Sequence, residues 1–404
     1  MPIILADIRA ARERIAGAIY VSPCPESSAL SQLTGSRIFC KLDSLQRTGS
    51  FKERGARNAL LLLSDEQRRR GVVAASAGNH ALALACHGSD LDIPVTVVMP
   101  RFAPLIKVAT CRRFAANVVL HGDNFAEAKA KADELAAAGG LTYIHGFDDP
   151  AVIAGQGTLG LELLEQVPDL DAVIVPVGGG GLVAGVSLAI KSLKSSVQIV
   201  GVEAAVMPSF SRALAAGSVV ACPARATLAD GLATTRLGDN AFAIARLRVD
   251  RVLSVSEELI ALSILRLIEL EKSVVEGAAA APLAALLSGQ LPELKGKTVA
   301  LLLCGGNIDP LVLGRIIDVG LAADGRLARL VATISDRPGG LAHLAALIAQ
   351  TGASVQQITH DRVFSGPDIS SVRVVCDVET HDHQHIETLL RTLAQQGIAV
   401  RLSE

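Results

Sequence analysis

Apolar runs that read as buried strands alternate with helical segments from about residue 37 to residue 320, and this alternation is the strongest constraint on the fold. Examples of the runs are VTVVM (95–99), AVIVPV (172–177) and VALLLC (299–304). Strands that are apolar on both faces are typical of parallel sheets with helices on each side. The pattern therefore predicts an α/β fold with two doubly wound parallel-sheet domains.

The last part of the chain has a different order of elements. Residues 327–404 predict strand, helix, strand, strand, helix and strand, which is the βαββαβ order of a ferredoxin-like unit. The segment 318–327 is the expected linker. We expect a region 1–320, in which a small domain of about 46–150 is inserted in a larger one, followed by a separate domain 327–404. Within the small domain, ARNALLLLSDEQRRR (56–70) predicts a single helix.

Composition excludes several classes of function. The 404 residues include 38 basic and 40 acidic side chains, and a net charge of −2 is unlike that of a nucleic-acid-binding protein. Nine Phe, two Tyr and no Trp are too few for a base-stacking platform or a membrane aromatic belt. The longest apolar stretch, 277–287, is too short to span a membrane. Seven scattered cysteines without a CxxC pair are typical of a reducing compartment, so we expect a cytoplasmic protein.

A lysine stands in a polar, glycine-containing turn that leads into a helix. The segment is KLDSLQRTGSFKERGA (41–56), in which Lys52 lies between Phe51 and Glu53. Taken alone, such a lysine is more often a solvated surface charge than a reactive amine. Its interpretation depends on the motifs that follow.

The turn SAGNH (76–80) lies between a predicted strand and a predicted helix. The first backbone N–H groups of a helix have no partners within the helix, and the helix dipole helps them to bind a carboxylate. The alternative is an ordinary helix start in which Ser76 or Asn79 is the N-cap. The sequence leaves both interpretations open.

Four successive glycines, Gly178, Gly179, Gly180 and Gly181, also lie between a predicted strand and a predicted helix. Backbone N–H groups of such a loop can curl around an anion, and phosphate sites use this context. A nucleotide site is disfavoured because this loop has neither a Walker lysine nor a strict GxGxxG with a downstream acidic residue. A flexible turn is the alternative, but ordering four glycines costs much conformational entropy.

Cys304 ends an apolar strand in LLLCGGNID (301–309). This is the edge at which open α/β sheets bind ligands, so the thiol is a candidate ligand contact. The alternative is a small buried hydrophobic side chain.

The order and spacing of these motifs resemble the fold-type II family of pyridoxal-phosphate enzymes, and within it the serine/threonine dehydratases. Over residues 15–320 the matching motifs are SFKxRGA, SAGNHA, DDPAVIAGQGT, GGGGL, TLADG, EGAAA and CGGNID. The resemblance implies pyridoxal 5′-phosphate as the cofactor. It also implies an ammonia-lyase that converts L-threonine, and L-serine as well, to 2-oxobutanoate or pyruvate and ammonia by β-elimination.

The resemblance further implies roles for individual residues. Lys52 would form the Schiff base with the cofactor, Asn79 would hydrogen-bond the oxygen on its ring, and Cys304 would face its ring nitrogen. Phe51 and Glu276 would lie beside the ring. The phosphate would bind a loop made of Gly178, Gly179, Gly180, Gly181 and Leu182. The substrate carboxylate would bind a turn made of Ser76, Ala77, Gly78, Asn79 and His80.

Some positions depart from the family pattern or extend it. Cys304 stands where most relatives carry Ser, and Gly146 stands where Pro is usual. Ala77 stands where serine racemases carry a Ser that reprotonates the substrate, so racemisation is disfavoured. Glu203 matches one ligand of a cation site in the family. Ser209 stands where a relative that binds a divalent ion has Asp, so a cation beside Glu203 would be monovalent.

The tail 327–404 resembles an ACT domain, a regulatory module for small molecules. Asp336 and the residues 338–340 lie in the turn where such modules bind amino acids, and a structural or dimerising tail is the alternative. For the whole chain, the alternatives are a serine or 3-hydroxyaspartate ammonia-lyase, a β-replacement synthase and a non-catalytic amino-acid sensor. The family implies a homo-oligomer with an amino-acid substrate and an amino-acid effector, and no nucleic-acid or membrane partner.

Overall fold

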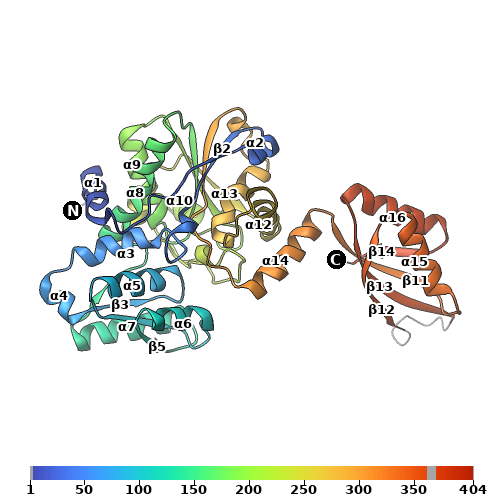
Figure 1. The fold of residues 1–404 in the computed structure, drawn as a ribbon, viewed down its shortest axis with the longest axis horizontal. Helices are drawn as coiled ribbons and strands as arrows, with labels where there is room; N and C mark the ends of the chain where they lie inside the picture. Colours follow the sequence, from blue (N-terminus) through green and yellow to red (C-terminus); the bar gives the residue numbers. More distant parts are fainter. Residues whose placement is uncertain (1–2, 362–369, 404) are drawn as a thin grey trace. The chain divides into compact units, whose positions relative to one another are not determined.

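A computed structural model describes residues 3–361 and 370–403. The chain forms two compact units that divide between Asp309 and Pro310. The first unit contains a six-stranded sheet and a four-stranded sheet, and the second contains another four-stranded sheet (Figure 1).

The larger sheet of the first unit has the strand order β1-β2-β10-β7-β8-β9. Its strands are β1 (Glu26–Ser27), β2 (Arg37–Lys41), β7 (Ala172–Pro176), β8 (Gln198–Ala204), β9 (Arg251–Val255) and β10 (Thr298–Leu302). Only β1 and β2 pair antiparallel, and the other neighbours are parallel. Strands β7 and β10 are buried along their whole length, which explains why their apolar residues do not alternate with polar ones.

Helices cover this sheet and connect its strands. They are α1 (Leu5–Ile15), α2 (Ser28–Thr34), α8 (Pro150–Gln166), α9 (Gly181–Leu193), α10 (Ser209–Ala216), α11 (Asp239–Ala245), α12 (Glu257–Glu271) and α13 (Gly277–Leu287). Short 3₁₀ turns are η1 (Asp43–Leu45), η2 (Asp230–Leu232) and η3 (Pro292–Leu294).

The smaller sheet has the order β5-β4-β3-β6, and all of its pairs are parallel. Its strands are β3 (Val72–Ala75), β4 (Val95–Met99), β5 (Asn117–Leu120) and β6 (Thr142–Tyr143). The helices of this part are α3 (Lys52–Leu61), α4 (Asp65–Arg70), α5 (Asn79–Asp90), α6 (Leu105–Arg113) and α7 (Phe125–Gly139). Two parallel α/β sheets confirm the predicted fold class. Helix α3 contacts both α5 and α8, so it joins the two parts of the unit (Figure 1).

The prediction of one helix over residues 56–70 is wrong. Helix α3 ends at Leu61 and α4 begins at Asp65. Ser64 is the N-cap of α4: its side chain accepts from the Gln67 N–H at 3.2 Å, and the Gln67 side chain accepts from the Ser64 N–H at 2.9 Å. This reciprocal capping box starts a second helix inside a segment with continuous helical propensity.

Glycines bring α8 unusually close to the helices on its two sides. A Cβ atom on Gly155 would lie 2.6 Å from the carbonyl oxygen of Arg54 in α3. A Cβ atom on Gly185 in α9 would lie 2.4 Å from the carbonyl oxygen of Ile153 in α8. The three helices therefore pack backbone against backbone, with no room for side chains at these points.

The second unit begins with α14 (Pro310–Ala323), so most of the expected linker 318–327 is helical. The elements after it are β11 (Leu327–Ser335), α15 (Gly340–Gln350), β12 (Ser354–Asp361), β13 (Ser371–Glu379), α16 (His383–Gln395) and β14 (Ala399–Leu402). The strands form an antiparallel sheet in the order β12-β13-β11-β14. The predicted βαββαβ order is confirmed.

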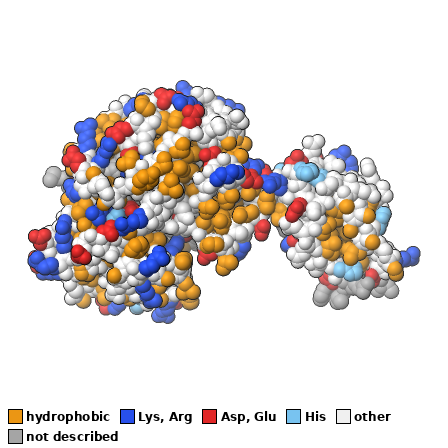
Figure 2. Space-filling model, viewed as in Figure 1, with side chains coloured by type: hydrophobic (Ala, Val, Ile, Leu, Met, Phe, Trp, Pro, Cys, Tyr) orange, Lys and Arg blue, Asp and Glu red, His pale blue; other side chains and the backbone are white. Residues whose placement is uncertain are grey.

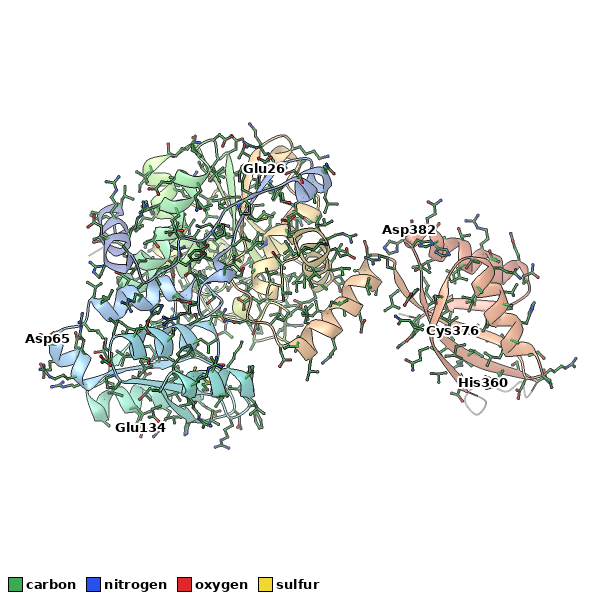
Figure 3. All side chains as sticks on the ribbon, viewed as in Figure 1. Glu26, Asp65, Glu134, His360, Cys376 and Asp382 are labelled. Carbon is green, nitrogen blue, oxygen red and sulfur yellow. The ribbon has the colours of Figure 1, made fainter. Side chains whose placement is uncertain are left out.

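The two helices of the ferredoxin-like part cover one face of its sheet. Buried residues alternate along β11 and β13 and pack with apolar residues of α15 and α16, such as Leu344 and Leu389. Cys376 of β13 is fully buried in this core, and Asp382 caps α16 by accepting from the His385 N–H at 2.8 Å (Figure 3). This alternation is what an antiparallel sheet with one covered face requires.

The surface agrees with the balanced charge of the sequence. Positive and negative side chains are interspersed over the face in view in Figure 2. Among residues 3–361 and 370–403, no helix has both the length and the apolar character needed to cross a bilayer.

A buried network of four charges fixes the start of α3. Arg54 is fully buried and donates to Asp43 at 2.7 and 2.9 Å and to Glu162 at 2.5 and 2.8 Å. Lys41, also fully buried, donates to Glu162 at 2.6 Å. Burial alone would raise the pKa of Asp43, but the charge and hydrogen bonds of Arg54 lower it overall. Two cations thus balance two carboxylates out of contact with water.

We expect Arg54→Met to lower the free energy of unfolding by about 3–5 kcal/mol, because it leaves Asp43 and Glu162 buried without their main partner. Urea unfolding measures the change. Arg12→Met is the control: it removes an exposed pair with Glu165, and we expect a loss below about 1 kcal/mol. Equal losses for the two variants would contradict the role given to the network.

Candidate active site

A cavity of about 240 Å³ lies where the carboxyl ends of strands from both parallel sheets of the first unit meet. The loops after β3, β6, β7 and β10 all reach it, as expected for a ligand site in an open α/β sheet. The structure brings together there every residue predicted to bind the cofactor or the substrate carboxylate: Phe51, Lys52, Ser76, Ala77, Gly78, Asn79, His80, Gly178, Gly179, Gly180, Gly181, Leu182, Glu276 and Cys304.

Lys52 is the first residue of α3, and its amine lies in the cavity. The amine donates to the carbonyl oxygen of Gly146 at 2.7 Å and lies 5.1 Å from the centre of the Phe51 ring. The backbone N–H of Phe51 donates to the carbonyl oxygen of Cys304 at 3.0 Å, which ties the lysine to the end of β10. Burial lowers the pKa of Lys52 to about 8, although the nearby Glu276 carboxylate acts in the opposite direction.

The residue after Lys52 is also buried and charged. Glu53 accepts from His87 Nε2 at 2.9 Å and from the backbone N–H of Thr48. Burial alone would raise the pKa of Glu53, but the hydrogen bonds from His87 and Thr48 lower it overall. Lys52 is therefore followed by two ionised side chains, Glu53 and Arg54, each held by its own partners.

The glycine loop is shaped by its contacts with neighbouring segments. A Cβ atom on Gly179 would lie 2.3 Å from the Phe147 ring, and one on Gly181 would lie 2.4 Å from the Phe147 carbonyl oxygen. Gly180 has a φ of 92°, in the left-handed region that favours glycine. The loop leads directly into α9, so backbone N–H groups without helical partners are available for an anion.

The turn between β3 and α5 differs from an ordinary capped helix start. Gly78 is the N-cap of α5, and no side chain accepts hydrogen bonds from the first N–H groups of the helix. Ser76 accepts from the Gly78 N–H at 3.3 Å, and Asn79 directs its amide elsewhere. The alternative in which Ser76 or Asn79 caps the helix is therefore not what the structure shows, and the free N–H groups remain available for a carboxylate.

Asn79 and Glu276 meet at the side of the cavity. The Asn79 amide donates to both carboxylate oxygens of Glu276, at 2.9 and 3.0 Å. Burial raises the pKa of Glu276 to about 7, and the negative charge of Asp230 adds to this effect while Asn79 opposes it. Gly305 leaves the necessary room, because a Cβ atom there would lie 2.2 Å from Glu276 Oε1. Glu276 can therefore gain or lose a proton near neutral pH.

Two further buried groups stay uncharged. Burial, with Glu276 nearby, raises the pKa of Cys304 well above its ordinary value, so the thiol keeps its proton. His80 donates from Nε2 to the carbonyl oxygen of Ile144 at 3.1 Å, while its buried Nδ1 has no hydrogen-bond partner among the described residues. Burial lowers the pKa of His80 to about 3, so its ring is neutral.

The structure also places residues in the cavity that sequence reasoning missed. Phe125, Tyr143, His145 and Phe147 line it. The His145 and Phe147 rings meet edge to face with centroids 4.5 Å apart, so His145 supports the aromatic ring that packs under the glycine loop. Tyr143, His145 and Phe147 belong to the segment 141–147, which predicts a strand that ends at the sheet edge where ligands bind, and Phe125 follows the predicted strand 117–122.

Glu203 lies outside the cavity, at the end of β8. Its carboxylate accepts from the backbone N–H groups of Phe210 at 2.8 Å and Ser211 at 3.0 Å, at the start of α10. Burial raises its pKa, although these hydrogen bonds act in the opposite direction. In the part of the chain that the structure describes, no three His, Cys, Asp or Glu residues form a cluster that could hold a metal ion. A monovalent cation beside Glu203 stays a prediction.

We expect the amine of Lys52 to react with aldehydes at a pH about two units below that of an exposed lysine, because burial lowers its pKa to about 8. The rate of labelling is measured by borohydride trapping and mass spectrometry of the peptide. It should rise with pH and level off above pH 8, and peptides with the exposed Lys295 give the internal reference. A rate that still rises steeply at about pH 10 would contradict the expected shift.

Several known proteins are similar to this chain in sequence and in fold. An L-threonine ammonia-lyase of Thermotoga maritima is 43% identical over 400 residues, which cover 99% of each chain. The solved structure of a processed threonine deaminase isoform from Solanum lycopersicum has a TM-score of 0.74 and 34% identity, and covers 79% of this chain and 90% of that one. The solved structure of maize serine racemase has a TM-score of 0.75 and 34% identity, and covers 78% of this chain and 97% of that one.

A family model described as "Pyridoxal-phosphate dependent enzyme" matches residues 15–305. This range contains both parallel sheets and all of the cavity residues named above. The match, the near-complete coverage of the bacterial relative and the two similar structures agree with one another. The chain belongs to the family of pyridoxal-phosphate dependent enzymes.

Proposed function

We propose that this chain is an ammonia-lyase that uses pyridoxal 5′-phosphate to convert L-threonine, and also L-serine, to 2-oxobutanoate or pyruvate and ammonia. The observation that carries the proposal is the convergence of one lysine amine, a glycine loop and a helix start with free N–H groups on one cavity. The name of the Thermotoga relative, 43% identical over nearly the whole chain, supports threonine as the substrate.

The residues present fit this cofactor. The loop from Gly178 to Leu182 has no room for a side chain at Gly179 or Gly181 and presents backbone donors suited to a phosphate. Lys52 would offer an amine to the aldehyde group, Asn79 would donate to the ring oxygen, and Cys304 would place a neutral thiol beside the ring nitrogen. When bound, the cofactor withdraws electrons from the substrate Cα, which makes the Cα proton easier to remove.

Lys52 is the residue that we assign to proton transfer at the substrate Cα. With cofactor and substrate bound, the Lys52 amine would be free in the cavity to act as a base. Its pKa, lowered to about 8 by burial, leaves a useful fraction unprotonated near neutral pH. The hydrogen bond to Gly146 holds the amine in place while it carries the proton.

The remaining assignments concern binding and the choice of reaction. The turn of Ser76, Ala77, Gly78, Asn79 and His80 would hold the substrate carboxylate on the free N–H groups of α5. A neutral Cys304 cannot stabilise a protonated ring nitrogen as a carboxylate would, which favours prompt departure of the β-hydroxyl. Ala77 has no proton to return to Cα, which supports elimination over the racemisation carried out by structurally similar relatives.

The organisation of the chain extends the proposal. The smaller parallel sheet supports a small domain of about 46–150 inserted in a catalytic region 1–320. The βαββαβ unit 327–404 supports an ACT-like regulatory domain, in which Asp336 and residues 338–340, at the turn before α15, would meet an amino-acid effector. Seven unpaired cysteines support a reducing, cytoplasmic location. We also propose that this chain forms a homo-oligomer.

The first test is a keto-acid assay with L-threonine, L-serine, 3-hydroxyaspartate and their D-forms. We expect turnover of L-threonine and L-serine, and a visible absorption band from the bound cofactor. Lys52→Ala should lose both the band and turnover because it removes the amine. A protein with neither band nor turnover would favour the amino-acid sensor, and fastest turnover of 3-hydroxyaspartate would favour that alternative substrate.

Two further measurements distinguish the remaining alternatives. Incorporation of an added thiol in place of the hydroxyl would favour a β-replacement synthase, whereas keto acid alone would exclude it. The assay is repeated with isoleucine or valine present. Rates that respond to neither amino acid would count against the regulatory role given to the unit 327–404.

We expect Gly179→Ala to weaken cofactor binding by about 10- to 100-fold, because its methyl group would overlap the Phe147 ring and force the loop to shift. Titration of the apo-protein with pyridoxal phosphate, followed by absorbance, measures the affinity. Gly314→Ala is the control, since a Cβ atom there meets nothing within 4 Å. Unchanged affinity in Gly179→Ala would contradict the assignment of the loop to the phosphate.

A further inference from the structure

Asn307, in the loop after β10, joins three segments that are far apart in the sequence. Its Nδ2 donates to the carbonyl oxygen of Thr48 at 2.7 Å and to Oδ1 of Asn79 at 2.9 Å. Thr48 belongs to the loop before Lys52, and Asn79 begins α5 beside the smaller sheet. Asn307 does not line the cavity, so any effect on a bound group must pass through another residue.

These contacts determine which way the Asn79 amide faces. A backbone carbonyl only accepts hydrogen bonds, so the group of Asn307 that faces Thr48 must be its NH₂. The same NH₂ faces Asn79, which must then present its oxygen. The NH₂ of Asn79 is left to point the other way, where it donates to both oxygens of Glu276 at 2.9 and 3.0 Å. The Thr48 carbonyl oxygen thus orients the Asn307 amide and, through it, the Asn79 amide, in the same sense as the Glu276 carboxylate does.

The loop before Lys52 is built around the Asn307 side chain. Gly49 has a φ of 77°, and a Cβ atom on it would lie 2.5 Å from Asn307 Oδ1. The carbonyl oxygen of Gly49 accepts from the Gly306 N–H at 2.9 Å, which fixes the two loops against each other. Both the conformation and the space at residue 49 therefore suit glycine, and that space is filled by the Asn307 amide.

We infer that Asn307 is a positioning residue that keeps the Asn79 NH₂ directed at the ring oxygen of the cofactor. The inference rests on the proposed function, in which Asn79 donates to that oxygen. A donor aimed at an oxygen stabilises its ionised form. Without Asn307, the Asn79 oxygen loses its donor and only Glu276 still orients the amide, so the stabilisation of the ring oxygen is weakened.

Asn307→Asp keeps the shape of the side chain and removes the donors, and Asn307→Leu, measured beside it, removes them without adding a charge that would itself raise the midpoint. The carboxylate of Asn307→Asp would face the Thr48 carbonyl, and Asn79 would turn its NH₂ toward residue 307. In the holoenzyme we expect the pH midpoint of the cofactor's absorption change to rise by about one to two units, the size expected for losing a hydrogen bond to a charged group. An unchanged midpoint would overturn the inference.

A double-variant cycle on cofactor affinity shows whether Asn307 acts through Asn79. We expect Asn79→Ala and Asn307→Ala each to weaken binding of pyridoxal phosphate by about 10-fold, and the double variant to be no weaker than Asn79→Ala alone. If the two effects multiply, Asn307 acts independently and the inference fails. This result would leave the proposed function intact, provided that the wild type shows the cofactor band and turnover.

Asn58→Ala is the matched control for the loss of a buried amide. Asn58 is 1% exposed and donates to the carbonyl oxygen of Ala151 at 2.7 Å, away from the cavity. It should lower thermal stability and leave both the absorption midpoint and the cofactor affinity unchanged. If Asn58→Ala shifts the midpoint as Asn307→Asp does, the shift reflects general loosening of the fold, and the inference is overturned.

Discussion

The buried pairing of Arg54 with Asp43 and Glu162 is the interaction on which the position of the reactive amine depends. Residues two apart on a helix do not face each other, so anchoring Arg54 on one side of α3 directs Lys52 away from the network. Glu53, held by His87, fixes the orientation between them. The direction of the side chain to which we assign proton transfer is thus set by two neighbours, Glu53 and Arg54, that stay ionised.

Burial acts on the cavity groups in a common way because it disfavours charge on each of them. It brings the pKa of Lys52 down to about 8 and that of Glu276 up to about 7, so two groups with very different ordinary values titrate close together. Cys304 and His80 are neutral for the same reason. The charge of a bound phosphate would be met by backbone dipoles, which have no proton to exchange with the reacting groups.

Three features could be predicted from sequence patterns. The alternation of apolar strands and helices predicted both parallel sheets, the order of elements in the tail predicted the ferredoxin-like unit, and the four successive glycines predicted the anion-binding loop. The end of α3 at Leu61 has a sequence signal, because Ser64 and Gln67 have the spacing of a capping box. The prediction missed it because residues 56–70 have continuous helical propensity. Phe147 under the loop and Asn307 against Asn79 could not be predicted, because such contacts join segments that only the folded chain brings together.

The close approach of α3, α8 and α9 limits which amino-acid substitutions this chain can accept during evolution. At Gly155 and Gly185 the neighbouring main chain occupies the place of a methyl group, so enlarging one residue requires a compensating shift of the facing helix. Helix α3, which faces Gly155, carries Lys52, and helix α9, which contains Gly185, follows the glycine loop. A larger residue at Gly155 or Gly185 therefore requires matching changes in the helix that it contacts. The sequences of α3, α8 and α9 are expected to change together.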